Sequence, residues 1–96
     1  MKKPILIDAI VFERLSDLPR SERADCLLVI HELPTSFGQP HIHSGLSIRK
    51  LRGKTVECRA NLRLRYLFQN RVDCLYIFAL ATHDEVQRIL RSGKLE

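Results

Sequence analysis

The first half of the chain has the period of helices. Ile5-Leu6-Ile7 is a short apolar run that predicts a strand. Asp8 is a suitable N-cap residue and Pro19 disfavours continuation, so we expect a first helix between them, to about residue 18. Its apolar face has the spacing i, i+4, i+7 and consists of Val11, Leu15 and Leu18.

A second helix follows the same rule. Ser21 is expected to cap its start and Pro34 to end it. Its apolar stripe has the spacing i, i+3, i+4, i+7 and consists of Cys26, Val29, Ile30 and Leu33. The next segment, 35–45, is rich in Gly and Pro and is predicted to be an irregular loop.

Beyond Gly45 the pattern becomes that of strands separated by short turns. The predicted strands are 46–51, 55–59, 63–69 and 72–81. The last one is apolar on both faces and is therefore expected inside the sheet. A short C-terminal helix is predicted at 85–94. The economical assembly is an α+β fold, with two N-terminal helices packed on a twisted, mostly antiparallel sheet of four or five strands.

Length and composition indicate one domain spanning residues 1–96. A chain of 96 residues with 45% hydrophobic content can bury a single core. No apolar run reaches the length of a membrane span, and the start is too short and too soon acidic for a signal peptide, so we expect a soluble cytoplasmic protein that binds no membrane. Cys26, Cys58 and Cys74 lie singly in apolar segments and are expected to be buried thiols.

Positive charge is concentrated in the middle of the chain, within a formal net charge of +5. Residues 1–33 contain five Lys/Arg and six Asp/Glu, and residues 73–96 contain three and four, so each end has a balance of −1. Residues 34–72 contain eight Lys/Arg and one acid, Glu57, a balance of +7. Since surfaces normally intersperse both signs, this block predicts an anionic partner. Nucleic acid is favoured over an acidic protein or a face kept basic for solubility.

The turn near Asn61 decides where these charges lie. With 60–62 as a three-residue loop, Arg59 faces Arg63 and Glu57 faces Arg65. One face then carries the apolar side chains Val56, Cys58, Leu64 and Tyr66. The other carries Glu57 and the three arginines, which we expect to point together into solvent. Like-charge arginine neighbours favour a bound anion, and the arginine fork matches phosphate oxygens, although a solvated face bridged by Glu57 is the alternative.

Basic and histidine side chains outside the hairpin are further candidates. Three of them extend the basic patch at the adjacent turn: Lys50, Arg52 and Lys54. His41 and His43 have the spacing of metal ligands, but their segment has no Cys, Asp or Glu, so we expect exposed loop histidines and no metal. His83 follows a core strand and should emerge at the sheet edge, where a structural and a catalytic role are both open.

Four fragments resemble the RelE/ParE toxin superfamily in their order and spacing, over nearly the whole chain. They are FERLSDLP (12–19), HSGL (43–46) with KLRG (50–53), ECR (57–59) followed by RLRY (63–66), and THDEV (82–86). The third is similar to the family's E-x-R … Y-R-x-x-Y hairpin, and the last to its junction between strand and terminal helix. The resemblance implies two helices on a twisted antiparallel sheet.

The resemblance also implies a function, because many members are ribosome-dependent mRNA endonucleases that use no metal or cofactor. In them the ribose 2′-hydroxyl attacks the adjacent phosphate, which requires a base, an acid and cationic stabilisation. Carried over by position, Arg63 and Arg59 would bind the phosphate and Glu57 or His83 would transfer protons. The full set of catalytic candidates is Glu57, Arg59, Arg63, Arg65 and His83, with Lys50, Arg52 and Lys54 on the RNA backbone.

Three positions depart from the family pattern. Leu62 replaces the tyrosine before the motif's arginine. At the end of the last strand, where an arginine and then a tyrosine are frequent, this chain has His83, a residue type that some members use there, and Gln87. The main expectation is a translation-inhibiting mRNA interferase of a type II toxin–antitoxin system, neutralised by an acidic, partly disordered antitoxin. The alternatives are a gyrase-inhibiting toxin of the ParE type and a catalytically inactive binding module.

Overall fold

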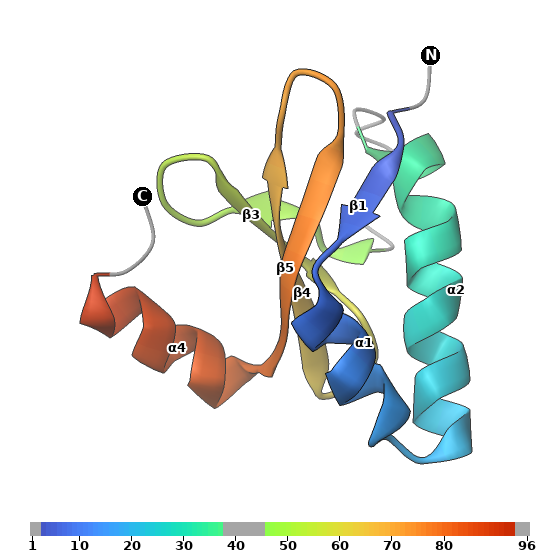
Figure 1. Cartoon of the computed structure of the whole chain (residues 1–96). Helices are drawn as coiled ribbons and strands as arrows, with labels where there is room; N and C mark the ends of the chain where they lie inside the picture. Colours follow the sequence, from blue (N-terminus) through green and yellow to red (C-terminus); the bar gives the residue numbers. More distant parts are fainter. Residues whose placement is uncertain (1–2, 38–45, 94–96) are drawn as a thin grey trace.

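A five-stranded sheet lies between two groups of helices in the computed structural model, which describes residues 3–37 and 46–93 (Figure 1). In chain order the elements are β1 (Ile5–Ile7), α1 (Ala9–Ser16), α2 (Arg20–Ser36), β2 (Arg49–Lys50), β3 (Thr55–Arg59), β4 (Leu64–Asn70), β5 (Leu75–Thr82) and α4 (His83–Ser92). The sheet order is β1-β5-β4-β3-β2, with β1 parallel to β5 and the other pairs antiparallel. The predicted α+β architecture is confirmed, including the interior position of the last strand.

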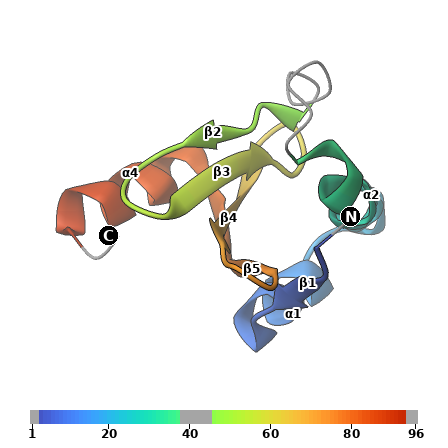
Figure 2. The same cartoon turned by 90° about the horizontal axis from the view of Figure 1, so that it is seen from above.

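The helices cover opposite faces of the sheet. Seen from above, α2 and α4 lie on opposite sides of the curved sheet, and α1 lies beneath β1 and β5 (Figure 2). The larger core cluster joins α1 and α2 to one face of the sheet, with the predicted stripes Val11, Leu15, Leu18 and Cys26, Val29, Ile30, Leu33 packed into it. Within it the Tyr66 hydroxyl donates to the Cys26 carbonyl oxygen at 2.7 Å, so the buried phenol is satisfied.

A smaller cluster holds α4 on the other face, which the sequence did not predict. Val86 of α4 is fully buried against Leu67 of β4 and Ala81 of β5. The helix begins at His83, earlier than expected, because Thr82 and Glu85 form a capping box. It ends at Gly93, whose φ of 73° is the left-handed conformation that favours glycine.

Three further predicted boundaries were wrong, and a tertiary contact explains one of them. Pro19 is the N-cap of α2, so Ser21 lies inside its first turn. Pro34 lies inside α2, which continues until the Phe37 N–H bonds the Leu33 carbonyl at 2.9 Å. The Phe37 ring packs edge-on against Phe68 with centroids 5.7 Å apart, and this contact anchors the helix end despite the proline. Strand β2 is shorter than predicted because Ser47 has a φ of 52°, which is not extended backbone.

The β3–β4 hairpin has a different register from the predicted one. Arg59 pairs with Arg65 instead of Arg63, a shift of two residues. The loop is closed by Asn61, whose Oδ1 accepts from the backbone N–H groups of Arg63 at 2.9 Å and Leu64 at 2.8 Å. Because the shift is even, the residues paired in the ladder keep their predicted faces, whereas Arg63 lies in the loop outside the ladder. The apolar set Val56, Cys58, Leu64 and Tyr66 is buried under the helices as predicted.

The cysteines are free thiols. Cys26 and Cys58 are buried as predicted, whereas Cys74 is half-buried. Burial raises the pKa of the Cys58 thiol to about 12 and that of Cys26 to about 11. Both are therefore protonated near neutral pH and serve as small core side chains.

Candidate nucleic-acid interface

A buried carboxylate organises the face of the sheet on which α4 packs. Glu57 is 0% exposed and lies between β2 and β4, opposite Arg49 on one side and Leu67 on the other. Arg49 donates from Nε to Glu57 Oε2 at 2.6 Å, and Arg65 Nε lies 3.5 Å from Oε1. The expectation that Glu57 points into solvent was wrong, because two strands and two guanidinium groups enclose it.

The two arginines extend outward from this carboxylate. The Arg49 side chain is 58% exposed and that of Arg65 is 26% exposed. A guanidinium group has five N–H donors, and the contact with Glu57 occupies only part of each set. The three side chains together carry a net charge of +1. This arrangement holds Arg49 by a hydrogen bond and attracts Arg65 by charge across 3.5 Å, and it leaves donors on both for an anion.

Arg59 adds a further positive charge beside this pair. It is opposite Arg65 in the ladder, is exposed, and has no ion pair among the residues that the structure describes. Cross-strand like charges repel each other at this separation unless an anion lies between or above them. The described part of the surface therefore has two adjacent arginines available to a phosphate group.

His83 lies at the end of the same row of residues. Arg59, Arg65 and Ala81 are aligned across β3, β4 and β5, and His83 follows two residues after Ala81. It is the first residue of α4 and is exposed, as expected for a side chain emerging at the sheet edge. The fold thus places a histidine near the end of the arginine row.

Arg63 is separated from this row. Its Nε donates to Glu22 Oε1 at 2.8 Å and its Nη2 to Glu22 Oε2 at 3.2 Å, which ties the hairpin loop to the first turn of α2. Asn61 Nδ2 donates to the same carboxylate at 3.1 Å. The ion pair lowers the pKa of Glu22 and raises that of Arg63. The expected grouping of Arg63 with Glu57, Arg59 and Arg65 in solvent is therefore not what the structure shows.

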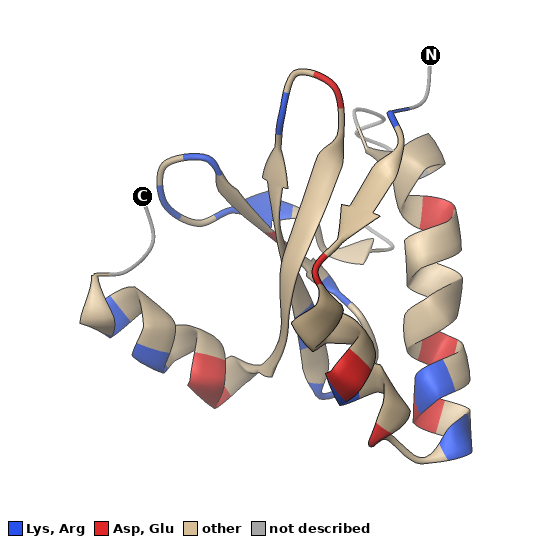
Figure 3. Cartoon of the chain, in the orientation of Figure 1, with Lys and Arg blue, Asp and Glu red and all other residues tan. Residues whose placement is uncertain are grey.

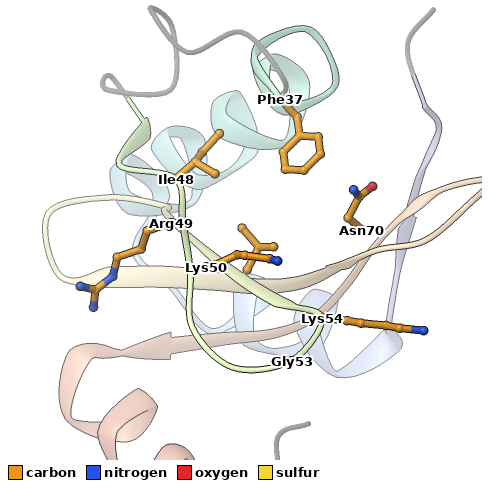
Figure 4. A pocket seen from close by; sticks show the side chains of 8 residues that line it. Phe37, Ile48, Arg49, Lys50, Gly53, Lys54 and Asn70 are labelled. Atoms are coloured by element: carbon orange, nitrogen blue, oxygen red, sulfur yellow. The ribbon is translucent and has the colours of Figure 1, made fainter.

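The three basic residues near the β2–β3 turn divide into two groups. Arg52 donates from Nη1 to the Leu90 carbonyl oxygen at 3.1 Å, near the C-terminal end of α4. Lys50 and Lys54 instead line a cavity on the side of the sheet that faces away from Glu57 (Figure 4). In Figure 4 the Arg49 side chain points away from the other labelled residues, consistent with the alternation of adjacent strand residues.

The charge block in the sequence also segregates in space. In Figure 3 most of the acidic positions lie on α1 and α2, and basic positions follow β2, β3, the hairpin loops and α4. Glu57, the one acid of the basic block, is buried and neutralised by arginines. Glu57, Arg49 and Arg65 together carry +1 and the exposed Arg59 adds another positive charge, so this surface stays positive.

Sequence reasoning missed two contributors to this face. Arg49 was overlooked because only the register of β2 on β3 places it opposite Glu57. The other is a link between helices, in which Arg14 of α1 donates to both oxygens of Glu85 on α4 at 3.0 and 2.9 Å. Glu85 Oε1 also accepts from the Thr82 N–H at 2.8 Å, so this carboxylate fixes the first turn of α4 beside His83.

Replacing Glu85 with Gln should make the stability less dependent on acid pH. The Arg14 bond first and the Thr82 backbone bond second lower the pKa of Glu85 to about 2. A lowered pKa stabilises the fold above the ordinary value of 4.5, and that contribution is lost as the pH falls through about 2. Because the pair is about one-third exposed, we expect about 1 kcal/mol or less at pH 7.

Thermal unfolding of Glu85→Gln and the unmodified protein between pH 7 and pH 2 measures this contribution. The two unfolding midpoints should differ at pH 7 and converge toward pH 2. Glu13→Gln is the control, since Glu13 is exposed on α1. A constant difference across the whole range would show that Glu85 does not stabilise the fold through its charge.

Across residues 3–37 and 46–93, no three His, Cys, Asp or Glu side chains gather as a metal site. His41 and His43 lie outside the described residues. Within the same ranges, none of the helices is both long enough and apolar enough to cross a membrane.

Comparison with solved structures identifies the fold. A RelE–RelB complex from the archaeon Pyrococcus horikoshii OT3 matches with a TM-score of 0.69 and 18% identity, covering 85% of this chain and 96% of that one. A RelB–RelE antitoxin–toxin complex from Methanococcus jannaschii gives 0.66 and 16%, covering 86% and 95%. A copper-bound mutant toxin from Helicobacter pylori gives 0.54 and 18%, covering 90% and 99%. No protein-family model matches the sequence, and no curated protein matches it. The chain has the RelE-like toxin fold.

Proposed function

We propose that this protein is the toxin of a type II toxin–antitoxin system and cleaves mRNA in the cytoplasm without a metal ion, most readily on the ribosome. The observation that carries the proposal is the arginine row on the α4 face, where Glu57 holds Arg49 and Arg65 and where Arg59 has no counter-charge among the described residues. Such a row matches the charge of a phosphodiester. The similarity in fold to RelE structures supports the same reading.

The reaction that fits this face is an internal transfer at phosphorus. The ribose 2′-oxygen forms a bond to the phosphorus and the bond to the 5′-oxygen breaks, while one proton leaves the 2′-hydroxyl and one reaches the 5′-oxygen. Arg65, Arg59 and Arg49 would neutralise the charge that develops on the phosphoryl oxygens. His83 is an exposed side chain two residues beyond Ala81 of this row, and imidazole is the group most often used in general acid–base catalysis, so we assign it the proton transfer.

Glu57 has a different role in this proposal from the one that the family resemblance implies. A proton acceptor must reach the 2′-hydroxyl, and a carboxylate that is 0% exposed and covered by two arginines cannot do so without their displacement. We assign it to positioning Arg49 and Arg65. Gln87 lies half-buried on α4 and does not titrate, so His83 would both accept the proton of the 2′-hydroxyl and donate a proton to the 5′-oxygen.

The partner in this proposal is an acidic antitoxin. The exposed positive charge on β2 to β4 is available to a chain of opposite sign, and two of the matching structures contain both RelE and RelB. An acidic segment covering the arginine row would block access to RNA by occupying the same donors. This arrangement would make inhibition sensitive to ionic strength.

Cleavage of mRNA in a bacterial translation extract tests the proposal. We expect the purified protein to cut translated mRNA, and His83→Ala to lower the rate by about 10²–10⁴-fold, the usual contribution of a proton-transfer group. Gln69→Ala, on β4 outside the arginine row, is the control. Translation arrest or growth arrest with intact mRNA would overturn the nuclease assignment, and loss of gyrase activity in the same extract would favour the ParE-type alternative.

A further inference from the structure

A cavity at the outer edge of the sheet combines an apolar wall with a basic rim. It has a volume of about 430 Å³ and lies between the end of α2 and the strands β2 and β3. Its wall consists of Phe37, Ile48 and Val56, and its rim carries Lys50, Lys54 and Asn70 (Figure 4). This combination of an apolar surface with a few polar groups is typical of a site for a small ligand group.

The charges at the rim indicate an anionic ligand. Lys50 and Lys54 have no ion pair among the described residues, and none of the residues that line the cavity is acidic. Both lysines are exposed, so their ammonium groups can approach a ligand without breaking a protein contact. The cavity can therefore accept a ligand that carries at least one negative charge.

The other polar and aromatic groups distinguish a nucleotide from an acidic peptide. Asn70 Oδ1 accepts from Lys3 Nζ at 2.6 Å, which orients the amide and leaves Nδ2 to donate to an acceptor on a base. The Phe37 ring lines the cavity and is held in place by its edge-on contact with Phe68. An aromatic ring and an oriented amide recognise the face and the edge of a base, neither of which an acidic side chain presents.

The position of β2 connects the cavity to the arginine row. β2 is an edge strand of two residues, Arg49 and Lys50, whose side chains point to opposite faces of the sheet. Arg49 contacts Glu57 on the α4 face, and Lys50 lines the cavity on the other face. Consecutive Cα atoms are about 3.8 Å apart, so a polynucleotide that crosses this edge meets both side chains.

We propose that the cavity is a nucleotide subsite for single-stranded RNA, with a base against Phe37 and the adjoining phosphates on Lys50 and Lys54. The RNA then passes over the edge at β2 to the arginine row, so this inference rests on the proposed function. The cavity holds a nucleotide that is not cleaved, and it contributes affinity and base preference instead of chemistry. Its ligand is an unpaired segment, because stacking on Phe37 requires a base that is free of its duplex.

Equilibrium binding of a fluorescent six-nucleotide RNA, 2′-O-methylated so that it cannot be cleaved, tests the subsite. The double variant Lys50→Ala/Lys54→Ala should weaken binding and reduce the slope of log affinity against log salt by about 1.4, or about 0.7 for each lost phosphate contact. Arg20→Ala is the matched control for loss of charge. It is exposed at the start of α2, about 26 Å along the helix axis from Phe37.

Removal of single bases from the RNA tests stacking directly. An oligomer without one base should bind the unmodified protein about 5-fold to 150-fold more weakly at the stacked position. The variant Phe37→Leu should bind the intact RNA more weakly than the unmodified protein does. It should also bind intact and abasic RNA with nearly equal affinity. Thermal unfolding of Phe37→Leu is measured in parallel to check that the variant is folded. Asn70→Ala gives a second test of RNA binding, because Asn70 is exposed and its replacement leaves the core unchanged.

The outcomes separate the subsite from the nuclease proposal. Variants that bind intact and abasic RNA like the unmodified protein would overturn the subsite even if mRNA is cut normally. Cavity-dependent RNA binding without mRNA cleavage would support the subsite and overturn the nuclease assignment. An acidic hexapeptide with one phenylalanine is the competing probe. If the Phe37 and Lys54 variants lose peptide binding but keep RNA binding, the proposal is overturned.

Discussion

Arg65→Ala is expected to lower the rate of mRNA cleavage by about 10²–10³-fold, the usual cost of removing one preorganised donor from a developing negative charge. Arg65 lies between Arg59 on β3 and Ala81 on β5, and its Nε is 3.5 Å from the buried Glu57. Both the register and the carboxylate therefore fix its guanidinium on the α4 face. Single-turnover cleavage of a translated mRNA measures the effect.

Arg63→Ala is the matched comparison, since it removes the same group two residues away. Its guanidinium is bonded to Glu22 on α2, so we expect a loss of less than about fivefold, the size of a partly exposed ion pair. The family resemblance assigns the phosphate to Arg63 instead. A large loss in Arg63→Ala with normal cleavage by Arg65→Ala would show that Arg63 leaves Glu22 to bind the phosphate.

A third variant separates these two readings. Glu22→Gln removes the charge that holds Arg63 while leaving the arginine row unchanged. If Arg63 must leave Glu22 to act, this variant should cleave faster than the unmodified protein. If Arg65 acts on the phosphate, Glu22→Gln should cleave at the normal rate.

Glu57→Gln is expected to reduce stability and activity together. Glutamine has nearly the same shape, but it lacks the charge that attracts Arg49 at 2.6 Å and Arg65 at 3.5 Å. Loss of a buried charge-assisted hydrogen bond costs about 1–3 kcal/mol, which should lower the unfolding midpoint by about 4 °C or more in a domain of this size. The cleavage rate should fall because the two arginine forks are no longer fixed.

The pH dependence of cleavage distinguishes positioning from proton transfer by Glu57. If Glu57 only positions the arginines, the rate of Glu57→Gln is lower at every pH and the shape of the profile is unchanged. If Glu57 is the base, the variant loses the acidic limb of the profile. Glu32→Gln, at an exposed site on α2, controls for loss of a carboxylate elsewhere.

Local patterns in the sequence were enough to predict the sheet and the layer that α1 and α2 form on one of its faces, but not the packing of α4 on the other. The helical stripes of α1 and α2 and the alternation in β3 and β4 predicted which side chains form the larger core. Side chains that share a face recur every 3.6 residues in a helix and every 2 residues in a strand. The spacing of apolar residues along the chain therefore predicts which side chains are buried. The even shift of the β3–β4 register left the two faces as predicted.

Contacts between distant residues decided what local patterns could not. Phe37 packs on Phe68 at the end of α2, which continues past Pro34. The Glu22 carboxylate drew Arg63 away from the other arginines. Each of these two contacts joins a helix region to a part of the β4 segment that is far away in the sequence. The early start of α4 is different, because the capping box of Thr82 and Glu85 is a local motif that the sequence carries.

The basic character of the site was therefore evident from the sequence, whereas its geometry was not. The block of charge at 34–72 is a property of composition, so it predicted an anionic partner without any structure. Which arginines act together depends on how β2, β3 and β4 are paired, and this pairing buried Glu57 between Arg49 and Arg65. Charge is additive along a chain, but an ion pair exists only where tertiary packing places both partners within a few ångströms.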